Sequence, residues 1–274
     1  MNAAVLAIDA GSTRTKCAVI KDDQVVGDTH WMTMFNFNAD DLDHQLKQAR
    51  QLLAIDQDGL EGVVIGNVVD AQNEVRTQFE QAFDGLPLLY VDRTQSARLK
   101  LGPLDFSHYP VEQLGVDRLC NGLAAYHHVN EQNSVIIDCG TYTTIELVSA
   151  EGQFKGGAVM PGPLMFESMW TQSQFYDPKH PADVFTKPEM SPGTDTIGSV
   201  QNGLYYGFKG MLFEVISQQM SSIRWSSTTT QLLVTGGYGE SLRKLLQLEF
   251  PKATVKPHLT LEGLYFLYLA NRPA

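Results

Sequence analysis

The sequence contains little cysteine: Cys17, Cys120 and Cys139 are the three in a chain of 274 residues. They lie far apart or beside turn residues and form no C-x-x-C pair, which argues against a disulfide framework and against a cysteine-ligated zinc site. We therefore expect them to be small buried side chains in a protein of a reducing compartment.

Long apolar runs are also missing. No stretch approaches the 18 apolar residues of a membrane-spanning helix, so no membrane partner is predicted. The N-terminal segment 1–8 is apolar, but it has no basic region and reaches Asp9 within the length of one strand, which does not fit a signal peptide. We expect a cytoplasmic protein.

Basic residues are outnumbered. The chain has 20 Lys and Arg against 31 Asp and Glu, a formal net charge of −11, and no block of basic residues. This excludes non-specific nucleic-acid binding, because no basic surface is available to displace counterions from phosphates. An anionic ligand would have to be held by a few local cations and by backbone amides.

Several catalytic motifs are absent: the P-loop lysine motif, the H-E-x-x-H of zinc proteases and the G-x-S-x-G of α/β-hydrolases. The seven histidines show no metal-ligand spacing, and the consecutive His127 and His128 cannot share one helix face. We assign the histidines to the surface or to the core.

The sequence does contain an internal duplication. Residues 9–28 align with residues 138–157 at a constant offset of 129, with six identities in twenty positions, where chance gives about one. The identical pairs are Asp9 and Asp138, Gly11 and Gly140, Thr15 and Thr144, Val19 and Val148, Gln24 and Gln153, and Gly27 and Gly156. An offset of this size is that of a domain, although two unrelated hairpins with the same turn chemistry remain the alternative.

Each copy reads as strands first, followed by alternating helices and strands. Apolar spacing predicts helices over 40–54, 73–83 and 197–220, a strand over 62–68, and a strand that begins at Gln231 and runs into a glycine turn at 236–237. We predict a duplicated α/β fold with an N-terminal half over 1–117 and a C-terminal half over 118–274.

Both copies begin with a D-x-G-[ST] turn, a pattern that suits phosphate binding. Glycine lets the backbone approach a ligand, hydroxyls and amides donate to phosphate oxygens, and a carboxylate holds hydrated Mg²⁺. If the two halves face each other, Asp9 and Asp138 could share one polyphosphate, with Lys16 and Arg14 supplying positive charge. The alternatives are plain β-turns and a lysine on a solvated strand face.

Two further clusters carry chemistry. In Gly115–Arg118, which precedes a predicted helix, Asp117 is either a helix-terminus group or a general base oriented by Arg118, and spacing alone does not separate these readings. The glycine turn at 235–239 follows a predicted strand, and Gly236 and Gly237 could accept an adenine or a ribose; a plain turn is the alternative.

Four motifs in fixed order resemble the type III pantothenate kinases, the family that includes the Bvg accessory factors. They are D-x-G-S-T-x-x-K at 9–16, G-x-D-R at 115–118, D-x-G-T-x-x-T at 138–144 with Glu146, and G-G-x-x-x-P-G at 156–162. The resemblance runs from Asp9 to Gly237. It implies the acetate and sugar kinase, Hsp70 and actin superfamily fold, which is ribonuclease H-like, and the ATP-dependent phosphorylation of pantothenate to 4′-phosphopantothenate.

The resemblance also implies roles for individual residues. Asp117 would be the catalytic base, Asp9 would hold Mg²⁺ through water, and Asp138 would bind a monovalent cation, K⁺ or NH₄⁺. The residues that would contact ATP are Asp9, Ala10, Gly11, Ser12, Thr13, Arg14, Thr15, Lys16 and Thr141, together with Gly236 and Gly237. Those that would contact pantothenate are Tyr109, Gly115, Val116, Asp117, Arg118 and Thr196.

The family has a tyrosine at a set distance before the G-x-D-R motif. In this sequence Tyr109 is one residue away from that distance, and His108 occupies the matching position. Two other residues depart from the family pattern: Ser12 stands where asparagine is common, and Leu119 where tryptophan is frequent. Neither of these two departures removes a group that phosphoryl transfer needs, whereas the choice between Tyr109 and His108 stays open.

The resemblance further implies a homodimer in which Thr196 completes the partner subunit's site. Gly203, Gly207 and Gly210 form a small-residue stripe on the helix after Thr196, a pattern that a helix of the same chain would also explain. Two other functions remain as alternatives: a sugar or hexosamine kinase of the same superfamily, and a non-enzymatic nucleotide-binding regulator.

Overall fold

The computed structural model describes residues 4–11, 13–32, 39–54, 59–67, 74–129, 132–174, 176, 178–179, 182–247 and 249–272. The chain divides into two compact units, unit 1 over 1–128 with 258–274 and unit 2 over 129–257. The boundary expected after residue 117 falls within the first turn of helix α4 (Val116–Val129), which begins in unit 1.

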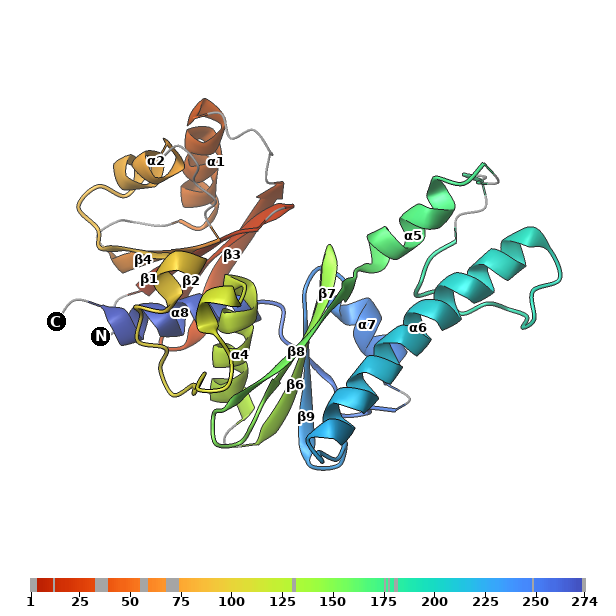
Figure 1. Ribbon diagram of the computed structural model, residues 1–274. Helices are drawn as coiled ribbons and strands as arrows, with labels where there is room; N and C mark the ends of the chain where they lie inside the picture. The colour runs from red at the N-terminus through yellow and green to blue at the C-terminus, as the bar shows by residue number, and fades with distance from the viewer. Residues whose placement is uncertain are drawn as a thin grey trace. The chain divides into compact units, whose positions relative to one another are not determined.

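Unit 1 is built on a five-stranded sheet in the order β3-β2-β1-β4-β5 (Figure 1). Strands β1 (Ala4–Ala10), β2 (Arg14–Lys21) and β3 (Gln24–Met32) form an antiparallel meander. Strands β4 (Leu60–Gly66) and β5 (Leu88–Val91) continue the sheet parallel to β1. The central strands β1 and β4 are buried on both faces, which explains their almost continuous apolar sequences.

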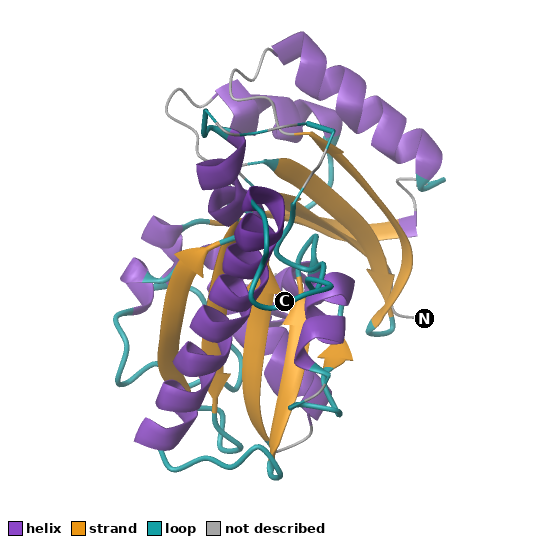
Figure 2. Cartoon of the chain, turned by 90° about the vertical axis from the view of Figure 1, so that its right-hand side faces the viewer, coloured by secondary structure: helices purple, strands orange, loops and turns teal. Residues whose placement is uncertain are grey.

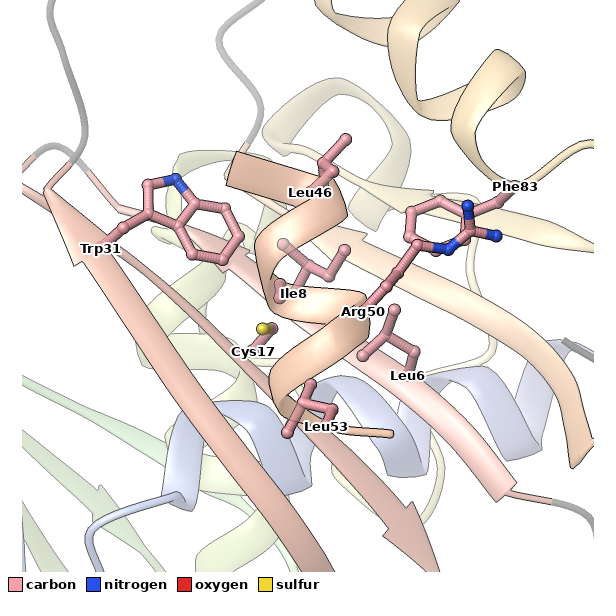
Figure 3. A pocket seen from close by; sticks show the side chains of 9 residues that line it. Leu6, Ile8, Cys17, Trp31, Leu46, Arg50, Leu53 and Phe83 are labelled. Carbon is pink, nitrogen blue, oxygen red and sulfur yellow. The ribbon is translucent and has the colours of Figure 1, made fainter. Parts of the chain in front are cut away.

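Helices α1 (Ala39–Leu52) and α2 (Glu74–Ala82) cover one face of this sheet (Figure 1). In Figure 3, Ile8 and Cys17 of the sheet lie between Leu46 and Leu53 of the α1 segment, with Trp31 to one side. The guanidinium of Arg50 lies 5.2 Å from the centre of the Phe83 ring and closes the edge of this apolar layer.

The other face carries the C-terminal helix α8 (Leu259–Asn271), which contacts β1, β2 and β4. A Cβ on Gly263 would overlap the Cys120 backbone, so glycine is needed where α8 crosses α4. Inside this contact the Thr260 hydroxyl donates to the buried Asn121 amide oxygen at 2.9 Å. These contacts explain why the end of the chain returns to unit 1 instead of completing the second half.

The two consecutive histidines also join α4 to α8. His127 stacks on Phe266 with ring centres 3.9 Å apart, and His128 Nε2 lies 2.7 Å from Glu262 Oε2. Both therefore pack between helices of unit 1, as expected for structural histidines. The two side chains nevertheless reach the same helix, so the expectation that consecutive histidines cannot share one helix face is too strict here.

Unit 2 has a second five-stranded sheet, in the order β10-β9-β6-β7-β8. Strands β6 (Asn133–Cys139), β7 (Tyr142–Val148) and β8 (Phe154–Pro161) form the meander, and β9 (Thr230–Thr235) and β10 (Thr254–Val255) extend it parallel to β6. Its helices are α5 (Pro163–Thr171), α6 (Thr196–Ser222) and α7 (Gly239–Leu246). Figure 2 shows α6, the long helix, lying across this sheet, where Leu204, Phe208 and Leu212 enter the core.

The matching strand orders of the two units confirm the predicted duplicated α/β fold. The strand ladders show one difference from the gapless sequence alignment. Asp9 pairs with Lys16 across β1 and β2, whereas Asp138 pairs with Thr144 and not with residue 145. The second turn is one residue shorter, so Thr144 takes the place across the sheet that Lys16 holds in the first unit.

Cys17, Cys120 and Cys139 are free and buried, which confirms their predicted packing role. Burial raises the pKa of Cys17 and of Cys139 to about 12, because the interior disfavours a thiolate. Among the described residues, no helix is both long and apolar enough to cross a bilayer.

Candidate active site

In unit 1, one edge of the sheet brings together the carboxyl ends of the parallel strands β1, β4 and β5. Asp9 near the end of β1 pairs with Gly66 of β4, and Gly66 pairs with Val91 of β5. The side chain of Asp9 is 7% exposed. Ligands of open α/β sheets bind beyond this edge, so the position of Asp9 suits a ligand-binding carboxylate.

Lys16 lies on β2 directly opposite Asp9. Residues directly opposite each other in a ladder share one face of the sheet, so Lys16 provides a positive charge on the face of Asp9. Ala10 and Thr15 form the next pair and belong to the other face, where Thr15 is 1% exposed and lies opposite Trp31. The structure thus separates the predicted phosphate-binding segment into two faces.

The turn between these strands contains the rest of the predicted segment. Gly11 is tightly placed, because a Cβ there would lie 2.8 Å from the carbonyl oxygen of Arg14. Thr13 and Arg14 are exposed. Ser12 lies outside the described residues, so its predicted role stays a prediction.

Asp117 occupies the first turn of α4, two residues after Gly115. The Leu119 amide donates to the Gly115 carbonyl at 3.0 Å, which starts the helix. A Cβ on Gly115 would overlap Asp117 Oδ1, so the carboxylate lies over the glycine backbone. This geometry explains a glycine two residues before the aspartate: any larger residue would move the carboxylate.

Asp9 and Asp117 belong to neighbouring segments of unit 1: a Cβ on Gly66, which pairs with Asp9, would lie 3.4 Å from Cγ1 of Val116, the residue before Asp117. Burial raises the pKa of the Cys120 thiol well above its usual value, and the negative charges of Asp9 and Asp117 raise it further. The predicted Mg²⁺ ligand and the predicted base therefore lie in one region of unit 1, although 108 residues separate them in sequence.

The remaining predicted pantothenate-binding residues of unit 1 lie around α4. Val116 is 2% exposed and packs in the core, so its side chain does not face an open site. Arg118 and Tyr109 are half-buried, whereas His108 is exposed. Leu119, which departs from the family pattern, is 1% exposed and fills the core under the loop.

In unit 2, three turns converge on the end of β6, where Asp138 lies. Gly162 donates its amide to the Thr141 carbonyl at 3.1 Å, and a Cβ on Gly162 would overlap the Gly140 carbonyl oxygen. Gly236 has φ +89°, and a Cβ on it would overlap Asp138 Oδ1. The structure therefore brings together Asp138, Thr141 and Gly236, and it adds Gly162, which the sequence presented only as part of a glycine cluster.

Gly237, next to Gly236, has open space around it. Thr144 lies opposite Asp138 and is 7% exposed, and within the described part of the chain its hydroxyl has no hydrogen-bond partner. Glu146, two residues further along β7, is fully buried. The end of β6 therefore combines the Asp138 carboxylate, the buried Thr144 hydroxyl and the backbone of Gly162 and Gly236, which packs closely against it.

Thr196 is the first residue of α6 in unit 2. The helix is capped by Asp195, which accepts the Gly198 amide proton at 2.6 Å. An open recess surrounds this helix end; its lining residues are Gly193, Thr194, Asp195, Thr196, Ser199 and Val200.

The donor set of unit 1 fits Mg²⁺ as kinases use it. Among the described residues, no group of three or more His, Cys, Asp or Glu side chains forms a protein-only metal cage. Mg²⁺ commonly binds through one or two carboxylates, water and substrate phosphates, and a single carboxylate such as that of Asp9 is sufficient for this arrangement.

Sequence reasoning missed one residue of this region, Asn67, which follows β4. Its Nδ2 donates to Asp9 Oδ1 at 2.7 Å. The signal that could have found it is the Gly-Asn pair directly after a buried strand, since asparagine tolerates the left-handed backbone that such a turn requires.

Solved structures share this fold. The chain is similar to component A of the (R)-2-hydroxyglutaryl-CoA dehydratase of Acidaminococcus fermentans, with 12% identity, a TM-score of 0.56 and coverage of 98% of this chain and 100% of the other. It is also similar to the activator of the 2-hydroxyisocaproyl-CoA dehydratase of Clostridium difficile with bound ADPNP, with 10% identity, a TM-score of 0.54 and coverage of 97% and 95%. These likenesses show that the duplicated α/β fold of this chain is shared by the two dehydratase components.

Comparison of the sequence with known protein families identifies the family within this fold. The model of the family "Type III pantothenate kinase" matches residues 5–218. The type III pantothenate kinase of Anaeromyxobacter sp. strain K is 30% identical over 271 residues, which cover 98% of this chain and 100% of the relative. The chain belongs to the type III pantothenate kinase family, whose members are phosphotransferases.

Proposed function

We propose that this protein transfers the γ-phosphoryl group of ATP to pantothenate, giving 4′-phosphopantothenate in the first step of coenzyme A biosynthesis. The family match over residues 5–218 carries this proposal. The packing of Gly66, the strand partner of Asp9, against Val116 beside Asp117 supports it, because the reaction needs a phosphate-side carboxylate and a base in one site. We place the reaction in the cytoplasm, where free cysteines stay reduced.

On the phosphate side, Asp9, Lys16 and the turn between them would hold the ATP phosphates. The Lys16 charge on the Asp9 face supports this, and the absence of a side chain at Gly11 lets a ligand approach the backbone there. Asp9 would hold Mg²⁺ through water; when bound, the metal neutralises the charge that develops on the phosphates. Ala10 and Thr15 would then act through their backbone, because their side chains belong to the opposite face.

From unit 2, Asp138 would bind a monovalent cation, K⁺ or NH₄⁺, and Thr141, Gly236 and Gly237 would contact ATP. Support comes from the close packing of the Gly236 backbone on Asp138 and from the open space around Gly237. A backbone without side chains at these positions can approach a flat ligand.

Asp117 would be the general base, with Tyr109, Gly115 and Arg118 around the substrate. Asp117 accepts the proton of the pantothenate hydroxyl while that oxygen attacks the γ-phosphorus. The bond from phosphorus to the β,γ-bridging oxygen breaks, and ADP leaves with that electron pair. The absence of a side chain at Gly115 leaves room for Asp117 Oδ1 over the glycine backbone and supports this role.

A coupled kinase assay tests the proposed function. We expect ADP formation with pantothenate and a phosphorylated product, no turnover with glucose or N-acetylglucosamine, and a strong rate increase when K⁺ or NH₄⁺ replaces Na⁺. Turnover with a sugar but not with pantothenate would favour the sugar kinase alternative. Nucleotide binding without turnover on any acceptor would favour the regulator.

We further propose that the protein is a homodimer, with Thr196 contributing to the partner subunit's site. On α5, Leu164, Met165 and Met169 are 60%, 39% and 80% exposed, an apolar surface of the kind that marks an interface. On α6, Gly207 packs against Phe166 of the same chain, so a contact within one chain accounts for this member of the stripe of small residues. A Cβ added to Gly203 or to Gly210 would meet no atom of a neighbouring element within 4 Å, so both have room for close contact with another helix.

Light scattering tests the dimer. We expect twice the chain mass of 30.4 kDa for the wild type and a shift toward monomer for Met169→Glu, because a buried charge in an interface is costly. Val26→Glu places the same charge at a residue that is 62% exposed in unit 1 and serves as the control. A wild-type monomer with full kinase activity would contradict the proposal.

A further inference from the structure

Asn67 connects the end of β4 to the carboxylate of Asp9. Its side-chain amide donates to Asp9 Oδ1 at 2.7 Å across 58 residues of sequence. Asn67 is half-buried and Asp9 is 7% exposed, so water competes weakly for this hydrogen bond. A hydrogen bond to a charged acceptor is among the stronger neutral-donor interactions in proteins.

The backbone of Asn67 is fixed on both sides. Gly66, the preceding residue, pairs with Asp9 in the sheet, and the Asn67 amide donates to the Val91 carbonyl of β5 at 3.2 Å. Asn67 has φ +63°, in the left-handed region that asparagine tolerates better than most residues. The side chain therefore extends from an anchored turn, and its direction toward Asp9 is built into the sheet edge.

We propose that Asn67 is a positioning residue for phosphoryl transfer: it fixes the orientation of the Asp9 carboxylate. This inference rests on the proposed function, in which Asp9 holds the hydrated metal. An amide suits the task because it orients the carboxylate through a hydrogen bond and leaves the negative charge in place. A cationic side chain at the same position would neutralise the charge that attracts Mg²⁺.

Two substitutions of Asn67 separate the effect of losing the side-chain amide from the effect of straining the backbone. Asn67→Gly removes the amide and keeps the left-handed backbone without strain, whereas Asn67→Ala removes the same amide and adds strain. The matched control is Asn271→Ala. Asn271 is also an amide of unit 1, but it bonds to the backbone of Lys100 at 2.9 Å and lies on α8 outside the proposed site.

For Asn67→Gly and Asn67→Ala alike, we expect kcat to fall about 10- to 100-fold, as for loss of a hydrogen bond to a charged group. The Mg²⁺ concentration that gives half-maximal activity should rise, while the KM for pantothenate stays within about twofold. Calorimetric titration adds a readout independent of turnover: the preference of the protein for Mg²⁺·ADP over metal-free ADP should decrease in both variants. Asn271→Ala should lower the melting temperature and leave the Mg²⁺ dependence unchanged.

The outcomes distinguish the two proposals. If the wild type turns over pantothenate and Asn67→Gly keeps the wild-type Mg²⁺ dependence and ADP preference, the positioning role is wrong. A loss seen in Asn67→Ala but not in Asn67→Gly would assign the effect to backbone strain and would also overturn it. If the wild type binds Mg²⁺·ADP without phosphorylating pantothenate, the proposed function is wrong, and the calorimetric comparison still decides whether Asn67 orients Asp9.

Discussion

Asp117→Asn is expected to lower kcat for pantothenate phosphorylation by about 10²- to 10⁴-fold, the contribution of a general base. The substitution keeps the shape of the side chain over Gly115 but removes its ability to accept a proton. Nucleotide affinity should stay within about twofold, because in the proposed mechanism Asp117 acts on the acceptor hydroxyl and not on ATP. Initial rates and calorimetric titration with ATP measure the two effects separately.

The same variant also tests the simpler interpretation of Asp117 as a helix-terminus charge. A negative charge in the first turn of a helix is worth about 0.3–1 kcal/mol. If that were its whole role, Asp117→Asn would lower the free energy of unfolding slightly and leave turnover unchanged. Glu112→Gln provides the control, because Glu112 is an exposed acidic residue in the short 3₁₀ helix Val111–Gln113, just before Gly115. It removes the same charge near α4 and should leave turnover unchanged.

Gly236→Ala is expected to abolish tight ATP binding and to lower stability. At φ +89° an alanine is strained by about 1–2 kcal/mol, and its Cβ would also overlap Asp138 Oδ1 and lie 2.5 Å from the Cys139 carbonyl oxygen. Either the carboxylate or the turn must move, and both belong to the proposed nucleotide site. Chemical denaturation gives the stability change, and titration with ATP gives the affinity.

Gly85→Ala isolates the strain from the overlap. Gly85 has φ +81°, nearly the same backbone conformation, but a Cβ there meets no atom within 4 Å. This control should lose a comparable part of the stability and keep the wild-type affinity for ATP. Equal loss of ATP affinity in both variants would show that general destabilisation, and not the displacement of Asp138, causes the effect.

The repeated hairpins could be predicted because their signals are local. Each copy carries its own acid-glycine turn and its own alternation of apolar residues, and the two sheets preserve this order. The register could not be predicted: an alignment by sequence pairs Thr144 with Thr15, whereas the shorter second turn places Thr144 where Lys16 lies in the first unit. A difference of one residue in the length of the turn decides which side chain lies opposite the aspartate, and a gapless sequence alignment does not reveal this difference.

The extent of the two units and part of the candidate site could not be predicted from the sequence, because they depend on contacts between residues far apart in the chain. The fit of Gly263 against Cys120 returns α8 to unit 1, and no local pattern near residue 117 or near residue 263 indicates this contact. Asn67 lies 58 residues from Asp9 in the chain, and only the pairing of β1 with β4 makes them neighbours. The contact of Asp117 with Gly115, by contrast, is local, because only Val116 separates them at the start of α4, but the role of Asp117 as the base stays a prediction.

The most direct measurement is a crystal structure of the protein with Mg²⁺, a non-hydrolysable ATP analogue and pantothenate. We expect an Asp117 carboxylate oxygen to lie within about 2.6–3.2 Å of the pantothenate hydroxyl oxygen that faces the γ-phosphate. A complex in which that hydroxyl is held by another side chain, with Asp117 turned away from the acceptor, would contradict the assignment of Asp117 as the base.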